Sequence, residues 1–138
     1  MIVVVTGSRS IADPDAVAKA IESAVTGPMG AYGTIDAVRE VWHGGAKGAD
    51  TLAAEWAASH GVTACAFVVT TAEWKADKFL AGKRRNYRMM RAASKDGRQV
   101  VVVAVWDGLS GGTAHAIGWA VALGLPVYVE HVRVGGGS

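Results

Sequence analysis

Residues 100–113 read VVVVAVWDGLSGGT, an apolar run followed by a glycine-rich turn. A continuous valine-rich run of this length is typical of a parallel strand that is buried on both faces. The alanine-rich sequence after the turn favours a helix over 113–122. This stretch therefore predicts a strand that passes through a tight turn into a helix, the repeating unit of an α/β fold.

Similar units occur elsewhere in the chain. We predict further strands over 2–5, 38–43, 62–69 and 127–129. Further helices are predicted over 14–25, 50–59 and 76–93, and a loop is predicted over 26–36. The strand over 100–105 is the most apolar and is expected at the centre of the sheet, and the helix over 76–93 contains a possible break at Gly82. Strands alternating with helices predict a single Rossmann-like, three-layer α/β domain with a mainly parallel sheet of about five or more strands. We place it at residues 1–134 and interpret 135–138, GGGS, as an added linker.

The bulk composition excludes several classes of protein. The chain has 138 residues, a net charge of +2, one cysteine and 18 glycines. Without a second cysteine or spaced histidine ligands, no metal and no other cofactor is expected. No apolar stretch approaches the ~20 residues that span a bilayer, and no signal peptide is visible, so we expect a cytoplasmic protein with no membrane partner. The weak net charge argues against nucleic acid as the main partner.

The internal glycines cluster where the predicted strands end. In open parallel sheets, ligands bind beyond the carboxyl ends of the strands. Glycine-rich turns at helix N-termini present free N–H groups that bind phosphate or carboxylate, and arginine matches phosphate with a bidentate fork. The G-x-G-x-x-G and Walker A motifs are both absent. We therefore predict a site for an anion-bearing ligand. Its predicted ligand-binding residues are Thr6, Gly7, Ser8, Arg9, His43, Gly44, Gly45, Asp50, Arg85, Asn86, Trp106, Asp107, Ser110, Gly111, Gly112 and Thr113.

Several side chains allow more than one interpretation. Asp50 can accept a ribose hydroxyl, although capping its helix or bracing the preceding loop is favoured. His43 suits a ligand contact, a general base or a loop hydrogen bond. The basic cluster Lys83–Arg91 faces either the ligand or solvent.

Four of the five tryptophans divide into two groups. Trp74 and Trp106 fall at predicted loop edges, where an indole ring is placed to stack on a base. Trp56 and Trp119 fall inside predicted helices and are expected in the core or in a subunit contact.

Four short motifs occur in order along the chain. They are VTGSR at 5–9, HGGAKGAD at 43–50, Trp74 followed by Gly82, Arg85, Asn86 and Met89, and WDGLSGGT at 106–113. From Met1 to about Glu130, this arrangement resembles the YspA, cpYpsA-related branch of the SLOG superfamily. More distantly it resembles the lonely-guy phosphoribohydrolases and the DNA-processing protein DprA. The resemblance implies a Rossmann-like fold with a site for a nucleotide or a nucleotide-derived small molecule.

The resemblance departs from the lonely-guy signature at one position. That signature carries a catalytic glutamate three residues after the threonine of its glycine motif, and Ala116 falls at this place. Hydrolysis of an N-glycosidic bond therefore loses its expected carboxylate, and the resemblance implies binding more than catalysis. The catalytic residues are unknown, with Arg85 and Asp107 as candidates.

Three functions follow. The first is a sensor or sequestering domain for a nucleotide-derived ligand, and the second is a nucleotide phosphoribohydrolase. The third is a self-assembling or DNA-associated scaffold. A homo-oligomer is expected because small relatives in this superfamily often self-associate.

Overall fold

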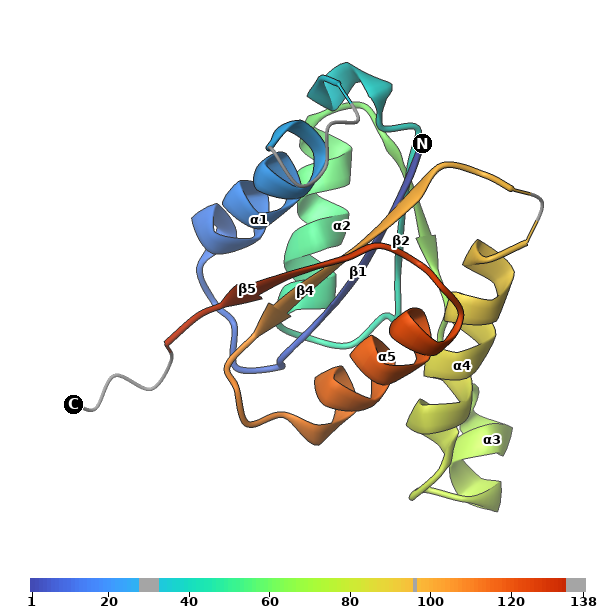
Figure 1. The fold of residues 1–138 in the computed structure, drawn as a ribbon. Coiled ribbons are helices and arrows are strands. Elements are labelled where there is room, and N and C mark those ends of the chain that lie inside the picture. Colours follow the sequence, from blue (N-terminus) through green and yellow to red (C-terminus); the bar gives the residue numbers. More distant parts are fainter. Residues whose placement is uncertain (28–32, 96, 134–138) are drawn as a thin grey trace.

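Five parallel strands form one sheet in the computed structural model, which describes residues 1–27, 33–95 and 97–133. The strand order is β3-β2-β1-β4-β5, and every pairing within it is parallel (Figure 1). This order confirms the predicted Rossmann-like α/β fold. The strands are β1 (Ile2–Gly7), β2 (Glu40–His43), β3 (Thr63–Ala66), β4 (Val100–Trp106) and β5 (Val127–His131).

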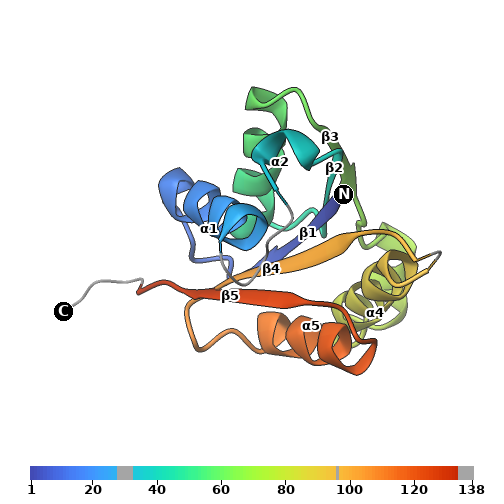
Figure 2. The ribbon, with the colours of Figure 1, turned by 45° about the horizontal axis from the view of Figure 1, so that its top comes forward.

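Helices cover both faces of this sheet. Helices α1 (Pro14–Thr26) and α2 (Ala49–Ser59) lie on one face, and α4 (Ala81–Ala93) and α5 (Gly111–Ala122) lie on the other (Figure 2). The start of α1 is capped by Asp13, which accepts a hydrogen bond from Asp15 N at 2.9 Å, and Pro14 occupies the first turn.

The alternation of side chains along each strand divides the core into two layers. Val3 and Val5 point toward α1 and α2, whereas Ile2 and Val4 point toward α4 and α5, and all four side chains are buried. Both layers are apolar because helices cover the strands on both sides, which explains the continuous valine runs in the sequence.

Two predicted elements differ from the structure. The helix predicted over 76–93 begins only at Ala81, and a separate short helix, α3 (Thr71–Ala76), precedes it. The chain turns between them because Asp77 Oδ1 accepts hydrogen bonds from the N–H groups of Phe79 and Leu80, each at 3.1 Å. The strand predicted over 62–69 pairs only over 63–66, at the exposed edge of the sheet.

The N-terminal loop and the strand order need smaller corrections. Part of the loop predicted over 26–36 overlaps a 3-10 helix, η1 (Ile35–Ala37). Residues 28–32 of that loop, and the interpreted linker 135–138, lie outside the described residues. Strand β4 is interior, but β1 occupies the middle position of the sheet.

The loops after β1 and β4 define the carboxyl edge. From β1 the chain continues through α1 on one face, and from β4 it continues through α5 on the opposite face. The loop after β1 and the loop after β4 therefore run to opposite faces of the sheet. Open α/β sheets form a ligand-binding crevice at such a point.

Candidate functional site

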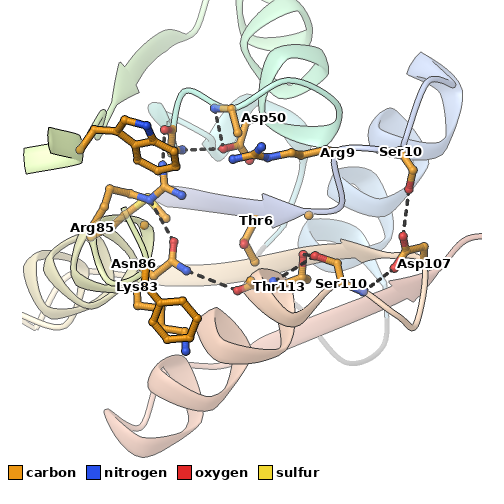
Figure 3. Close-up of a pocket in the computed structure, with 18 of the residues that line it drawn as sticks. Thr6, Arg9, Ser10, Asp50, Lys83, Arg85, Asn86, Asp107, Ser110 and Thr113 are labelled. Atoms are coloured by element: carbon orange, nitrogen blue, oxygen red, sulfur yellow. Dashed lines mark hydrogen bonds between the residues drawn. The ribbon is translucent and has the colours of Figure 1, made fainter. Parts of the chain in front are cut away.

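A cavity of about 530 Å³ lies at the carboxyl ends of β1 and β4 (Figure 3). It is bordered by the end of β1 and the loop after it, the β2–α2 loop, the segment from α3 to α4, and the β4–α5 loop with the start of α5. Its lining residues are Thr6, Gly7, Arg9, Ser10, Gly44, Ala46, Asp50, Trp74, Lys78, Phe79, Gly82, Lys83, Arg85, Asn86, Met89, Asp107, Ser110, Gly112 and Thr113.

Most of the predicted ligand residues line this cavity together. They are Thr6, Gly7, Arg9, Gly44, Asp50, Arg85, Asn86, Asp107, Ser110, Gly112 and Thr113. Those that do not line it are Ser8, His43, Gly45, Trp106 and Gly111. Ser8 and Trp106 instead brace the loops around the cavity. Ser8 Oγ accepts a hydrogen bond from Asp107 N at 3.0 Å, and Trp106 Nε1 donates to Ser110 O at 3.0 Å.

Asp50 holds the β2–α2 loop from inside. Its Oδ2 accepts hydrogen bonds from Gly44 N at 3.0 Å and from Ala46 N at 3.2 Å. The N-cap of α2 is Gly48, without a side-chain cap, so the loop-bracing interpretation of Asp50 fits and the capping one does not. Burial raises the pKa of Asp50, while the Ala46 N–H group and the Arg85 charge oppose this shift.

His43 is a buried part of the same loop. Its Nδ1 accepts a hydrogen bond from Gly45 N at 3.0 Å, so the proton of the neutral ring lies on Nε2. Burial lowers the pKa of His43, and Asp50 opposes this shift. Because the ring does not line the cavity, the structure supports the loop hydrogen bond and offers no geometry for a general base.

Arg85 joins α4 to the β2–α2 loop. Its Nη1 donates to Gly44 O and, at 3.4 Å, to Phe67 O, and its Nε donates to Asn86 Oδ1 at 3.0 Å. These acceptors are all neutral oxygens. Among the described residues, the one ion pair joins Arg88 to Glu73. The half-buried guanidinium of Arg85 therefore lines the cavity with its positive charge and has no carboxylate within hydrogen-bond distance.

The β4–α5 loop is held in shape by Asp107. Its Oδ1 accepts from Leu109 N and Ser110 N, both at 2.8 Å, and its Oδ2 accepts from Ser10 Oγ at 2.9 Å. These donors, with Leu109 N first, lower the pKa of Asp107 to about 2. The carboxylate is therefore ionised at neutral pH and cannot serve there as a general acid.

The first turn of α5 is open to the cavity. The helix begins at Gly111, so the N–H groups of Gly111 and Gly112 have no acceptor within the helix. Ser110 Oγ accepts a hydrogen bond from Thr113 N at 3.5 Å, and the buried Asn86 donates to Gly112 O at 3.3 Å. Asn86 thus ties α4 to the N-terminus of α5, as the labelled side chains in Figure 3 show.

The structure separates the basic cluster into two faces. Arg85 lines the cavity, Arg84 and Arg88 border a different groove on the outer side of α4, and Lys83 borders both. Lys78 and Phe79 line the cavity, but the sequence predicted no ligand role for them because both fell inside the long helix predicted over 76–93. A signal was present in Asp77, a residue that often starts turns.

Two kinds of feature are absent from the part of the chain that the structure describes. Within it, no group of three His, Cys, Asp or Glu side chains is arranged to hold a metal ion. None of its helices combines the length and apolarity needed to cross a membrane.

Fold and cavity define a Rossmann-like protein with a basic, glycine-lined site at the carboxyl edge of its sheet. The chain belongs to the YspA, cpYpsA-related SLOG family, whose model matches residues 1–76. This match confirms the resemblance to the YspA branch over residues 1–76. It ends before Arg85 and α5, so the roles of those parts rest on geometry. No curated protein and no solved structure matches the chain.

Proposed function

We propose that this protein binds a nucleotide or nucleotide-derived small molecule, with its phosphate in the cavity at the carboxyl edge. The observation that carries the proposal is the Arg85 guanidinium, which lines the same cavity as the open first turn of α5. A guanidinium and the free N–H groups of a helix N-terminus both favour phosphate. Membership of a SLOG family supports a nucleotide-related function.

The charges around the cavity favour an anionic ligand. Four cationic side chains line it, and they are Arg9, Lys78, Lys83 and Arg85. The two acidic side chains, Asp50 and Asp107, both accept hydrogen bonds from loop N–H groups. The cationic side chains therefore outnumber the acidic ones, and both carboxylates already accept hydrogen bonds from the loops. A phosphate that enters the cavity meets a net positive charge.

Titration calorimetry with AMP and with adenosine tests this proposal. AMP should bind more tightly than adenosine, and Arg85→Gln should weaken AMP binding by about 10- to 100-fold, since a hydrogen bond to a charged group is worth about 1.5–3 kcal/mol. Arg84→Gln is the matched control, because Arg84 is exposed on the same helix and lies outside the cavity. Equal weakening in both variants, or no difference between AMP and adenosine, would contradict the proposal.

The side chains of the cavity support binding of the nucleotide without hydrolysis. Ala116 is fully buried in the core layer beneath α5, so the place of the lonely-guy glutamate offers no carboxylate. Asp107 is ionised and occupied by loop donors, and Asp50 braces the β2–α2 loop. Incubation with AMP should therefore release no adenine, and measurable release by chromatography would favour the phosphoribohydrolase alternative.

We propose self-association as a second property, on the outer side of α4 and α5. A groove of about 460 Å³ there is lined by Tyr87 and Trp119, whose rings pack edge to face with centroids 4.5 Å apart. Trp56, the other candidate for a subunit contact, is buried and stacked on His60. Light scattering tests the property: Tyr87→Lys should reduce the oligomer, and a monomeric wild-type protein would contradict it.

A further inference from the structure

The segment from Thr70 to Leu80, which we call the α3 arm, lies along one side of the cavity. None of its side chains is buried, so the core contributes little to its position. Local contacts hold it instead. Thr70 and Glu73 form a capping box, with hydrogen bonds of 3.1 Å in both directions, and Glu73 forms an ion pair with Arg88 of α4 at 2.6 Å.

Two large aromatic side chains of the α3 arm line the cavity while remaining exposed. Trp74 is 44% exposed and Phe79 is 78% exposed. The part of a ring that stays exposed gains nothing from folding, and exposed apolar groups at the border of a polar cavity mark binding surfaces. Neither ring is needed to fill the core, so their placement calls for a ligand.

The polar and charged groups that line the rest of the cavity indicate what the remainder of that ligand is. Arg85 and the first turn of α5 supply the N–H donors and positive charge, whereas the α3 arm supplies flat apolar surface. The two kinds of surface belong to one cavity. Their combination matches a molecule with an anionic end and a planar aromatic end.

We infer that the α3 arm is the base-recognition element of the site, with Trp74 as the main stacking surface. The inference rests on the proposed function and names the ligand class, a nucleoside phosphate whose base stacks on Trp74. Phe79 also lines the cavity, and the ammonium group of Lys83 lies 4.7 Å from the centroid of its ring. Trp106, the other tryptophan predicted to stack, does not line the cavity and donates its N–H to Ser110 O.

Comparing AMP with ribose 5-phosphate isolates the base contribution. Trp74→Ala should weaken AMP binding by about 5- to 150-fold, because stacking of a base on an aromatic side chain is worth about 1–3 kcal/mol. The same variant should leave ribose 5-phosphate binding unchanged, and Trp74→Phe should recover most of the AMP affinity. Val121→Ala is the matched control, since Val121 is 64% exposed and lies outside the cavity.

Intrinsic fluorescence gives a second readout. AMP should quench the tryptophan emission of the wild-type protein, and Trp74→Phe should lose most of that quenching. If AMP binds and Trp74→Ala binds it as tightly as wild type, the inference is overturned while the proposed function stands. Equal loss for AMP and ribose 5-phosphate would show a structural role only and would also overturn it. If wild type binds neither compound, both proposals fail.

Discussion

Gly44 and Gly48 belong to the same loop, but the structure requires glycine at the two positions for different reasons. A Cβ at Gly44 would lie 2.4 Å from Arg85 Nη1, the end of a flexible side chain. Gly48 has a φ of +84°, and a Cβ there would lie 2.5 Å from the backbone oxygen of Ser8. A side chain at Gly44 therefore displaces a site residue, whereas one at Gly48 strains the backbone.

Alanine substitutions at the two glycines should separate binding from stability. Gly48→Ala should lower the free energy of unfolding by about 1–3 kcal/mol, because a left-handed backbone and a backbone contact are both violated. Gly44→Ala should cost less stability but should weaken AMP binding about as much as Arg85→Gln. Urea unfolding and calorimetry on both variants check this, and the reverse order of effects would contradict it.

His43 makes the folded state sensitive to acid. Burial lowers its pKa below the ordinary value of 6.5, so as the pH falls below about 6.5 the unfolded state binds a proton first and stability decreases. Protonation would also remove the acceptor of the Gly45 N–H group. Asp50 acts in the opposite direction, because its raised pKa makes the folded state the first to bind a proton.

His43→Asn isolates the histidine contribution, since an amide oxygen can still accept from Gly45 N. This variant should lose less stability than wild type between about pH 7 and pH 5.5, measured by urea unfolding. His115 shares the direction of the effect, because burial and Lys83 lower its pKa, so part of the slope should remain. An unchanged slope in His43→Asn would show that this histidine is not the sensor.

At the scale of single residues, the sequence predicted positions better than roles. The glycine loops after the parallel strands meet at one edge of the sheet, and Arg85 of α4 lines the same cavity. Trp106 was predicted to bind ligand, but it braces its own loop, and for His43 the structure supports the loop hydrogen bond, one of the three roles predicted. Which way a loop side chain points depends on hydrogen bonds between segments distant in sequence, such as Asp107 N to Ser8 Oγ.

At the scale of elements, the decisive arrangement is α4 beside α5. Asn86 is only 5% exposed and makes two hydrogen bonds, accepting from Arg85 Nε and donating to Gly112 O. One amide therefore fixes both the arginine of the site and the first turn of α5. A break in the long predicted helix was expected at Gly82, but Gly82 lies inside α4, and the chain turns earlier, where Asp77 accepts hydrogen bonds from Phe79 N and Leu80 N.

Removing the Asn86 amide should affect stability and the site together. Asn86→Ala should lower the free energy of unfolding by about 1–3 kcal/mol, because it leaves buried polar groups without partners. Arg91→Ala, at an exposed position of the same helix, should change it by no more than about 0.5 kcal/mol. Urea unfolding of both variants is the measurement, and equal stability of the two would contradict this role.

At the scale of the whole molecule, a valine-rich core layer covers each face of the sheet, and the candidate site lies at the carboxyl ends of β1 and β4. The fold was predictable because buried parallel strands leave a clear apolar signal in the sequence. The exposed edge strand β3 was overestimated, since an apolar run alone does not show where pairing ends. The ligand chemistry, by contrast, comes from surfaces that only the folded chain brings together.

The most direct test of the central proposal is a titration of the ¹⁵N-labelled protein with ADP, followed by amide chemical shifts. We predict that the shifts change first at Gly44, Gly112 and Thr113, around Arg85 and the start of α5, and that Arg85→Gln removes most of these changes. Changes confined to the groove beside Tyr87 and Trp119, or no changes at millimolar ADP, would contradict a phosphate site at the carboxyl edge.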